Sequence, residues 1–448
     1  MKLKTYLKKD LHLITQIFRE HMVILLLILL SYFATYGLNL YLANLLKPQL
    51  YGNISIVFQL LLFTMPFALL GTELSMMHFL PKYFHDHEYP LISGFIRWNF
   101  RLFAIISLVV LAVGGILLSV SLMLEGIGFV NLTEYNVILY SFWLIPLFAL
   151  IVLLATLLQT MGRFYLATSF RGFALSFMIL LTVFLFLHAF ETSWVGGYRK
   201  TISLIICLAI SYLVIIGLEI YFLRKTLPKK VYKVKPHYQT KHWTQYSVEM
   251  LGSFLGYTAL SALEILLLQL FGANKADVGH FASILVISSS MMVLALAVDM
   301  FVNPLISSLV HKNRLHLQSV LDIVNLFKLV PATLLLLVIV FFGESLLSHF
   351  GKSFEGAYPA LLVLAVGYFY GLTLNSAVPL LLYSGHHRLN FKLSLVQLAF
   401  ILLTSGILIP MYALVGAAIS LSLTIIFAGT MRLFFVRKYL DIKLLFVV

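Results

Sequence analysis

Long apolar stretches recur along this chain, and they constrain its fold more than any other feature. A helix of about 20 apolar residues crosses the hydrocarbon core of a bilayer. Since 61% of the 448 residues are hydrophobic and only 11% are charged, a soluble core cannot bury them. The sequence predicts an all-α integral membrane protein with about twelve transmembrane helices. The apolar runs lie at about 22–46, 53–79, 98–124, 136–160, 171–190, 201–223, 246–271, 280–308, 319–348, 359–383, 393–411 and 414–436.

The distribution of Lys and Arg predicts how these helices are oriented. With the N-terminus in the cytoplasm, the even-numbered connections, both termini and the adjoining ends of the apolar runs hold 25 of the 31 basic residues. The odd-numbered connections hold five, and Lys328 lies inside a predicted span. One missed helix would invert every later loop and remove this bias. We therefore expect both termini in the cytoplasm, and we attribute the net charge of +14 to orientation and not to nucleic-acid binding.

A basic linker in the middle of the chain sets the predicted domain boundaries. Residues 224–245 carry Lys and Arg but no acidic residue. The linker separates an N-terminal six-helix bundle, 22–223, from a C-terminal one, 246–436. A basic segment, 1–21, precedes the bundles without the cleavage pattern of a signal peptide, and a tail, 437–448, follows them. The linker is expected either to lie against anionic lipid or to contact a substrate headgroup or a partner.

Two short sequence patterns recur in both halves and in the same order. Residues 46–52 line up with 273–279 at an offset of 227, and residues 157–163 line up with 380–386 at an offset of 223. Six helices return the chain to its starting side, so the two halves run in the same sense. The sequence therefore predicts a parallel repeat about a pseudo-two-fold axis along the membrane normal.

Eight short motifs keep a characteristic order relative to the predicted spans. They lie at 46–52, 79–83, 159–163, 279–281, 303–304, 384–386, 409–412 and 415–418. Together they resemble the polysaccharide and O-antigen flippases of the multidrug, oligosaccharidyl-lipid and polysaccharide exporter superfamily. The likeness runs through nearly the whole chain. It departs at His78, where such proteins often carry Arg, so that a titratable imidazole replaces a permanent charge.

This resemblance implies a transport function in the bacterial inner membrane. It implies that polyprenyl-pyrophosphate-linked oligosaccharides move from the cytoplasmic to the periplasmic leaflet by alternating access, for synthesis of surface polysaccharide such as lipopolysaccharide O-antigen. Implied partners are this substrate, membrane lipids, H⁺ or Na⁺, and polysaccharide polymerase machinery, with no cofactor. The first alternative is a multidrug exporter of the same superfamily, which would favour a more acidic or aromatic cavity. The second is a polytopic polysaccharide polymerase, but no long external loop is predicted to hold a catalytic site.

Three ionisable residues deep in the predicted spans are candidates for ion coupling. Such groups cost about 2.5–3.5 kcal/mol at the membrane centre, so they mark a polar cavity or an ion pair. Asp299 and Lys328 lie equally far from the connection between spans eight and nine, and therefore at the same depth. They either pair or line a cavity separately. Glu264 has no cation at its depth, and it either exchanges a proton or cation or is bonded to Ser, Thr or Asn as a structural carboxylate.

Two further sets of residues are candidates for substrate contact. Amides at membrane depth either join helices or line a sugar path. These are Asn39, Gln59, Asn303, Asn375 and Gln397. Basic residues at the predicted cytoplasmic mouth either bind a pyrophosphate or only reflect the positive-inside bias. These are Lys82, Arg97, Arg101, Arg163, Arg171 and Arg388.

The remaining polar and turn signals favour structural roles. Residues 85–88, His-Asp-His-Glu, look like metal ligands, but one tetrapeptide rarely closes a tetrahedral site, so we expect a solvated turn and no metal. Glu219 is expected to reach Arg224 or Lys241 in the linker. Pro48 and Gly52 suit a tight turn, whereas Gly416 allows close helix approach.

Overall fold

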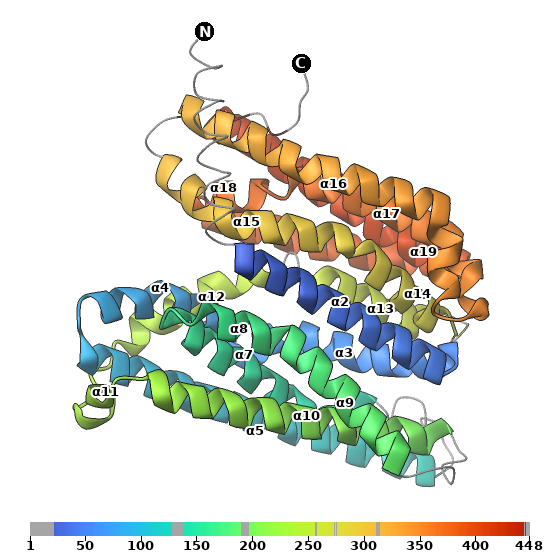
Figure 1. Cartoon of the computed structure of the whole chain (residues 1–448), viewed down its shortest axis with the longest axis horizontal. Coiled ribbons are helices and arrows are strands. Elements are labelled where there is room, and N and C mark those ends of the chain that lie inside the picture. Colours follow the sequence, from blue (N-terminus) through green and yellow to red (C-terminus); the bar gives the residue numbers. More distant parts are fainter. Residues whose placement is uncertain are drawn as a thin grey trace. The chain divides into compact units, whose positions relative to one another are not determined.

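The computed structural model describes residues 22–127, 138–189, 197–255, 258–272, 274, 276–310, 314–442 and 444. Regular structure in these ranges is helical throughout (Figure 1). The predicted N-terminal segment, 1–21, lies outside them, as does most of the tail beyond 442. The helices are α2 (Met22–Leu45), α3 (Pro48–Leu69), α4 (Thr72–His85), α5 (Tyr89–Gly126), α7 (Leu144–Thr160), α8 (Phe164–Arg171), α9 (Phe173–Ala189), α10 (Gly197–Thr226), α11 (Lys229–Lys233), α12 (Thr240–Leu255), α13 (Thr258–Phe271), α14 (Ala276–Ser288), α15 (Ser290–Leu309), α16 (Arg314–Ser348), the 3₁₀ helix η1 (Lys352–Ala357), α17 (Tyr358–Leu374), α18 (Ala377–Tyr383) and α19 (His387–Leu440).

Eight helices in the described ranges are long and apolar enough to cross a membrane, and nine are if the bent pair α14–α15 counts as one span. The chain is therefore an all-helical, multi-pass membrane protein. Three features separate nine from the predicted twelve. Helix α7 has only 17 residues, and α19, with 54 residues, contains two of the predicted apolar runs. The predicted run 246–271 is divided between two shorter helices, α12 and α13.

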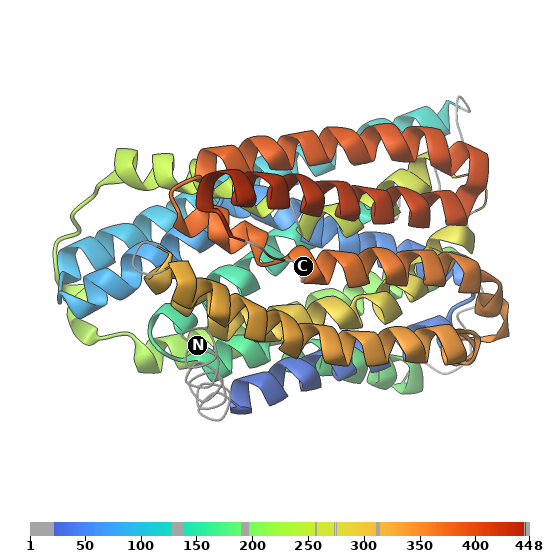
Figure 2. The same cartoon turned by 90° about the horizontal axis from the view of Figure 1, so that it is seen from above.

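Helix α19 consists of two antiparallel stretches that meet at Ala413. This residue has a φ of 47°, which a helix does not tolerate, and it lies three positions after Pro410. The hydroxyls of Thr404 and Ser420 are 2.8 Å apart across the two stretches, which lie side by side in Figure 2. A Cβ on Gly416 would lie 2.0 Å from the carbonyl oxygen of Leu408, so this glycine permits the close approach predicted for it.

The helices form two compact units that interleave in the sequence. Unit 1 comprises Met1–Gly52 and Leu263–Val448, and unit 2 comprises Asn53–Ala262. Helix α2 accordingly packs against α14 and α15, whereas α12 packs against α4. These packing units do not coincide with the sequence halves 22–223 and 246–436. The halves describe the predicted repeat, and the division into two six-helix bundles stays a prediction.

The interior of unit 1 is an apolar core between α15, α16 and the C-terminal helices. Buried side chains of α15 and α16, including Ile306, Leu317 and Val324, pack with Leu380 of α18 and Val436 of α19. Figure 1 shows α15 and α16 running alongside each other from their shared connection. Because the two helices are adjacent and antiparallel, polar residues at equal distances from that connection face the same level of the core.

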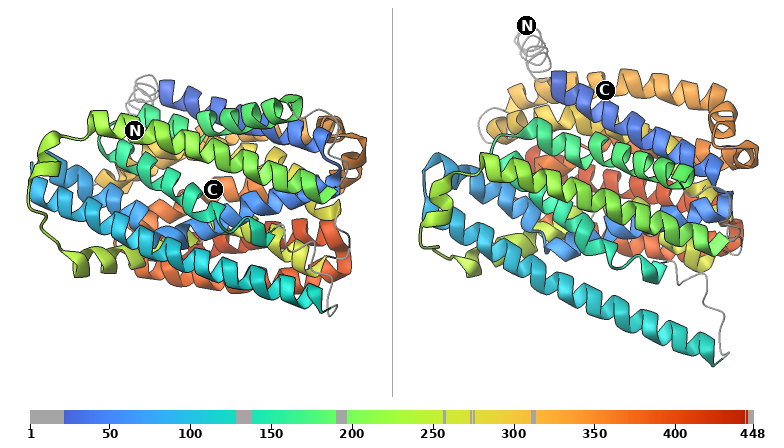
Figure 3. Two further views of the ribbon diagram at one scale, coloured as in Figure 1. Left: turned by 90° about the horizontal axis from the view of Figure 1, so that it is seen from below. Right: turned by 60° about the horizontal axis from the view of Figure 1, so that its bottom comes forward.

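Helix α7 forms the centre of unit 2. Its residues from Ile151 to Leu158 are buried, and it packs against α4, α8 and α10. The C-terminal half of α5 lies apart from these helices, as the right-hand view of Figure 3 shows. Apolar side chains there, such as Leu108, Ile116 and Met123, are exposed. A helix that exposes so much apolar surface is suited to contact with lipid.

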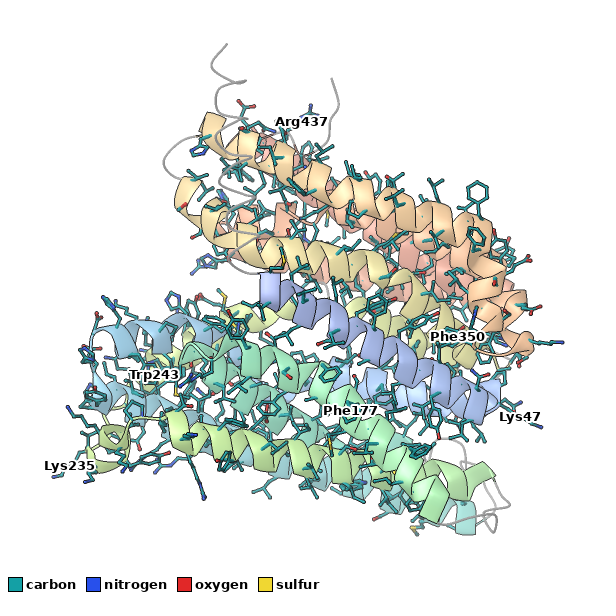
Figure 4. The ribbon with its side chains drawn as sticks, viewed as in Figure 1. Lys47, Phe177, Lys235, Trp243, Phe350 and Arg437 are labelled. Atoms are coloured by element: carbon teal, nitrogen blue, oxygen red, sulfur yellow. The ribbon has the colours of Figure 1, made fainter. Side chains whose placement is uncertain are left out.

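The basic linker is packed against unit 2 over part of its length. The amide of His237 donates to the carbonyl oxygen of Pro90 at 2.9 Å, and a Cβ on Gly94 would lie 1.8 Å from the His237 oxygen. Trp243 is fully buried, and its indole N–H donates to the hydroxyl of Tyr83 at 3.2 Å. Figure 4 shows Trp243 among the helices and Lys235 at the outer end of the linker. Burial raises the pKa of the Tyr83 hydroxyl.

The prediction that Gly52 lies in a tight turn with Pro48 is wrong. Helix α3 already begins at Pro48, so Gly52 lies inside its second turn. A Cβ on Gly52 would be 2.8 Å from the amide nitrogen of Gly279, and a Cβ on Gly279 would be 2.0 Å from the carbonyl oxygen of Pro48. The missing side chains therefore allow two backbones to approach.

Candidate functional site

Asp299 and Lys328 form an ion pair in the interior of unit 1. The Lys328 ammonium contacts Oδ1 of Asp299, and the side chain of Lys328 is 0% exposed. Asp299 comes from α15 and Lys328 from α16, so the pair joins the two adjacent helices as their equal depth predicts. The pairing agrees with the first of the two sequence interpretations, whereas a role in ion coupling stays a prediction.

Two neighbouring polar groups complete the environment of this pair. The amide of Asn375 donates to Oδ2 of Asp299, so both carboxylate oxygens are bonded. The ammonium of Lys328 also donates to the hydroxyl of Ser376 at 3.2 Å. Both residues lie at the break between α17 and α18. Additional hydrogen bonds of this kind reduce the desolvation cost of a buried ion pair, and both partners of this pair have one.

Glu264 lies in a different environment in the same unit. It is 0% exposed on α13, and its Oε2 accepts a 2.8 Å hydrogen bond from the hydroxyl of Ser405. The Ser405 hydroxyl is 2.7 Å from that of Ser420, which in turn contacts Thr404. Oε1 of Glu264 has no hydrogen-bond partner among the described residues. Both sequence interpretations therefore have support, since one oxygen is bonded to serine and the other is available.

Arg432 is a buried cation that the sequence did not single out. It lies in the second stretch of α19 and is 5% exposed. Its Nε donates to Oδ1 of Asn390 at 3.2 Å, and its Nη2 donates to Ser394 at 3.1 Å and to Oε1 of Gln397 at 2.9 Å. Gln397, a predicted cavity residue, thus joins the two stretches of α19. The available signal was the position of Arg432 inside an apolar run, close to the basic residues Arg437 and Lys438.

Arg171 is half-buried in unit 2 and differs from the other predicted rim residues, which are exposed. Its Nη2 contacts Oε1 of Glu73 at 3.0 Å and donates to the carbonyl oxygen of Val152 at 3.1 Å and to the hydroxyl of Thr156. Helices α4, α7 and α8 are thereby connected. Glu73 was also missed, although it lies in the apolar run 53–79. The other rim residues are exposed: Lys82, Arg97, Arg101 and Arg163 in unit 2, and Arg388 in unit 1.

Glu219 of α10 does not make the contact expected for it. It is 0% exposed, and neither carboxylate oxygen has a hydrogen-bond partner in the described parts of the chain. The expected contact with Arg224 or Lys241 is therefore wrong, because both of these side chains are exposed while Glu219 points inward. The charged residue whose field acts on Glu219 is Arg171.

The remaining predicted cavity residues have mixed surroundings. Asn39 donates to the carbonyl oxygen of Thr35 at 2.8 Å and accepts a 2.9 Å bond from the hydroxyl of Tyr51, so it links α2 to α3. Gln59 is half-buried, and Oδ1 of Asn303 is buried without a partner among the described residues. The tetrapeptide 85–88 forms an exposed turn between α4 and α5.

Comparison with solved structures places this architecture among transporters. A multidrug resistance transporter of the MATE family and the MOP superfamily, in an inward-facing conformation, has a TM-score of 0.68 at 12% identity, over 92% of this chain and 94% of its own. The MATE multidrug transporter DinF-BH has a TM-score of 0.66 at 13% identity, over 95% of each chain. The lipid II flippase MurJ, in an inward closed conformation, has a TM-score of 0.64 at 15% identity, over 92% of this chain and 87% of its own.

Sequence comparison adds one local relative. No protein-family model matches the chain. A segment of 89 residues is 35% identical to the capsular polysaccharide biosynthesis protein CapF of Staphylococcus aureus, and it covers 19% of this chain and 22% of that protein. The chain therefore shares its fold with solved multidrug transporters and with a solved lipid II flippase.

Proposed function

We propose that this protein is an ion-coupled flippase in a bacterial inner membrane, which carries polyprenyl-pyrophosphate-linked oligosaccharides to the periplasmic leaflet for surface polysaccharide synthesis. The observation that carries this proposal is the local match to a capsular polysaccharide biosynthesis protein. It occurs in a chain whose fold is shared with a protein named as a lipid II flippase. The order of the sequence motifs supports the same assignment.

In this proposal the chain crosses the membrane twelve times and both termini are cytoplasmic. The second stretch of α19, the 17-residue α7, the bent pair α14–α15 and the pair α12–α13 each supply a further crossing beyond the eight long helices. In a variant with Cys207→Ser, we expect Lys235→Cys to react with an impermeant maleimide only from the cytoplasmic side. Lys47→Cys, at the opposite end of α2 from the N-terminal segment, is the matched control and should react only from outside. Reaction of Lys235→Cys from outside would contradict the topology.

The polar groups of unit 1 provide the proposed coupling. Glu264 binds a proton or Na⁺ through its available oxygen, while Ser405 holds the other. Asp299 and Lys328 act as a paired element whose contact can open as the transporter changes conformation. The exposed basic residues of the rim attract the pyrophosphate, and the amides at membrane depth contact the sugar. A polysaccharide polymerase would receive the product.

The direct test is the fate of the glycan precursor in a deletion strain. We expect lipid-linked precursor to accumulate on the cytoplasmic leaflet and surface polysaccharide to be lost, with recovery on re-expression. Single repeat units on the outer leaflet, translocated but not polymerised, would instead identify a polymerase. Glycosyltransferase genes beside the coding sequence would give independent support.

A multidrug exporter is the second candidate, and one specific observation favours it. In unit 2 the interior group around Arg171 contains two carboxylates, Glu73 and Glu219, for one guanidinium. Excess carboxylates suit an organic cation. If the deletion strain keeps its surface polysaccharide and the purified protein drives efflux of a cationic dye from proteoliposomes, the exporter assignment replaces the flippase assignment.

A further inference from the structure

Unit 2 contains a second group of ionisable residues, separate from Glu264, in which two buried carboxylates lie near a half-buried arginine. Arg171 on α8 contacts Glu73 on α4, and Glu219 on α10 lies within the field of the same guanidinium. All three elements pack around α7, which carries no titratable residue. The described part of α9 that packs on α10, from Phe173 to Phe186, adds none either. On α10 itself, Tyr212 lies two turns before Glu219.

The unused hydrogen-bonding groups of these residues are complementary. Nε of Arg171 is buried and has no acceptor among the described residues. Both oxygens of Glu219 are buried and have no donor there. An ionised carboxylate without a hydrogen bond is very costly in such surroundings, so in this arrangement Glu219 is neutral or binds a cation. A change of the Arg171 rotamer would supply the donor that the ionised carboxylate needs.

We propose that Glu219 is a proton-binding site in which Arg171 alternates between two carboxylates. When Glu219 holds the proton, Arg171 pairs with Glu73, as the structure shows. When Glu219 releases the proton, Arg171 turns toward it and the contact with Glu73 weakens. The exchange would shift α4 and α10 relative to α7. The site itself stands on the geometry of unit 2, whereas its use in driving transport rests on the proposed function.

Labelling with dicyclohexylcarbodiimide tests the site without any substrate, because this reagent modifies protonated carboxyls in apolar surroundings. The purified full-length protein is labelled across a pH series, and the adduct on the peptide that contains Glu219 is measured by mass spectrometry. We expect an adduct on Glu219 that decreases as the pH is raised. Absence of the adduct at every pH would overturn the proposal.

Two variants should move the half-labelling pH in opposite directions. Glu73→Gln leaves Glu219 as the carboxylate partner of Arg171, so ionised Glu219 is favoured and the half-labelling pH falls by on the order of one unit. Arg171→Gln removes the cation, so the half-labelling pH rises. If Arg171→Gln does not accumulate, Arg171→Lys is measured in its place. Lysine keeps the charge but not the guanidinium hydrogen bonds, so its half-labelling pH should lie above the wild-type value.

Glu264→Gln, in the other unit, is the matched control and should leave labelling of Glu219 unchanged. A purely structural group would lower the abundance of the variants without moving these values. An unmoved half-labelling pH in Glu73→Gln would therefore refute the exchange. If the labelling follows these expectations but the protein exports no glycan, the proton-binding site is supported and the proposed function is wrong.

Discussion

Unit 1 buries two carboxylates that differ in what surrounds them. Asp299 is bonded through both oxygens, to a lysine ammonium and to an amide. Glu264 lies against the hydroxyls of Ser405 and Ser420, and its Oε1 has no hydrogen-bond partner in the described structure. A carboxylate that is bonded to a buried ammonium and to an amide joins two helices through fixed contacts. A carboxylate surrounded by hydroxyls can gain or lose a proton with little reorganisation. The comparison therefore assigns a structural role to Asp299 and a coupling role to Glu264 within one unit.

The largest expected effect is on stability, from Asp299→Asn. This change strands the buried Lys328 ammonium and should lower the free energy of unfolding by about 3–5 kcal/mol. Adding Lys328→Met removes the stranded charge and should recover much of the loss. Denaturant unfolding in detergent measures both variants. If the single variant is as stable as wild type, the two carboxylates are alike and the comparison fails.

A smaller loss is expected when the amide partner of Asp299 is removed. Asn375→Leu deletes a hydrogen bond to a charged group and should cost about 1.5–3 kcal/mol. Asn39→Leu is the matched control, because its bonds go to a neutral carbonyl oxygen and a neutral hydroxyl, and its cost should be about 1 kcal/mol. Equal costs would indicate that the charge of Asp299 does not strengthen its bond to Asn375.

Removal of the Ser405 hydroxyl, which bonds to Glu264, should lower the free energy of unfolding by less than removal of the Asn375 amide. Ser405→Ala is expected to lower the free energy of unfolding by about 1 kcal/mol, because a neutral hydroxyl bond is lost. Ser283→Ala controls for the serine itself, since the buried Ser283 hydroxyl bonds to a carbonyl oxygen of its own helix at 2.7 Å. A loss in Ser405→Ala as large as that in Asp299→Asn would show that Glu264 is held as a fixed charge.

The smallest effect on stability should come from Glu264→Gln, which keeps the shape and the bond to Ser405. We expect the free energy of unfolding to change by less than about 1 kcal/mol, while transport is lost or becomes insensitive to pH. Glu344→Gln, at an exposed position of α16, should leave both unchanged. Normal surface glycan with unchanged pH dependence in Glu264→Gln, at wild-type abundance, would make Glu264 structural.

The depth of residues along neighbouring helices could be predicted from the sequence, and tertiary contacts could not. Asp299 and Lys328 were placed at one depth because they lie at equal distances from one connection on antiparallel helices, and an ion pair was one of the two interpretations that this depth allowed. The contact between Arg171 and Glu73 depends on how α4, α7 and α8 pack, and loop charge gave no information about that packing. Arg171 was therefore grouped with exposed basic residues, from which the structure separates it.

The break in α19 explains the other omissions. Gln397 and Arg432 meet because the chain reverses at Ala413, and their separation in the sequence gives no sign of contact. A charge-by-charge inspection of the apolar runs would have identified Arg432 and Glu73 as interior residues. Their partners would still have required the fold.

The contact between Gly52 and Gly279 limits how either position can change. A Cβ on one glycine would meet the backbone of the segment that carries the other. Because neither residue has a side chain to lose, a substitution at one of them cannot be relieved by a smaller residue at the other. An alanine at either position would therefore have to move the backbone of α3 or of α14.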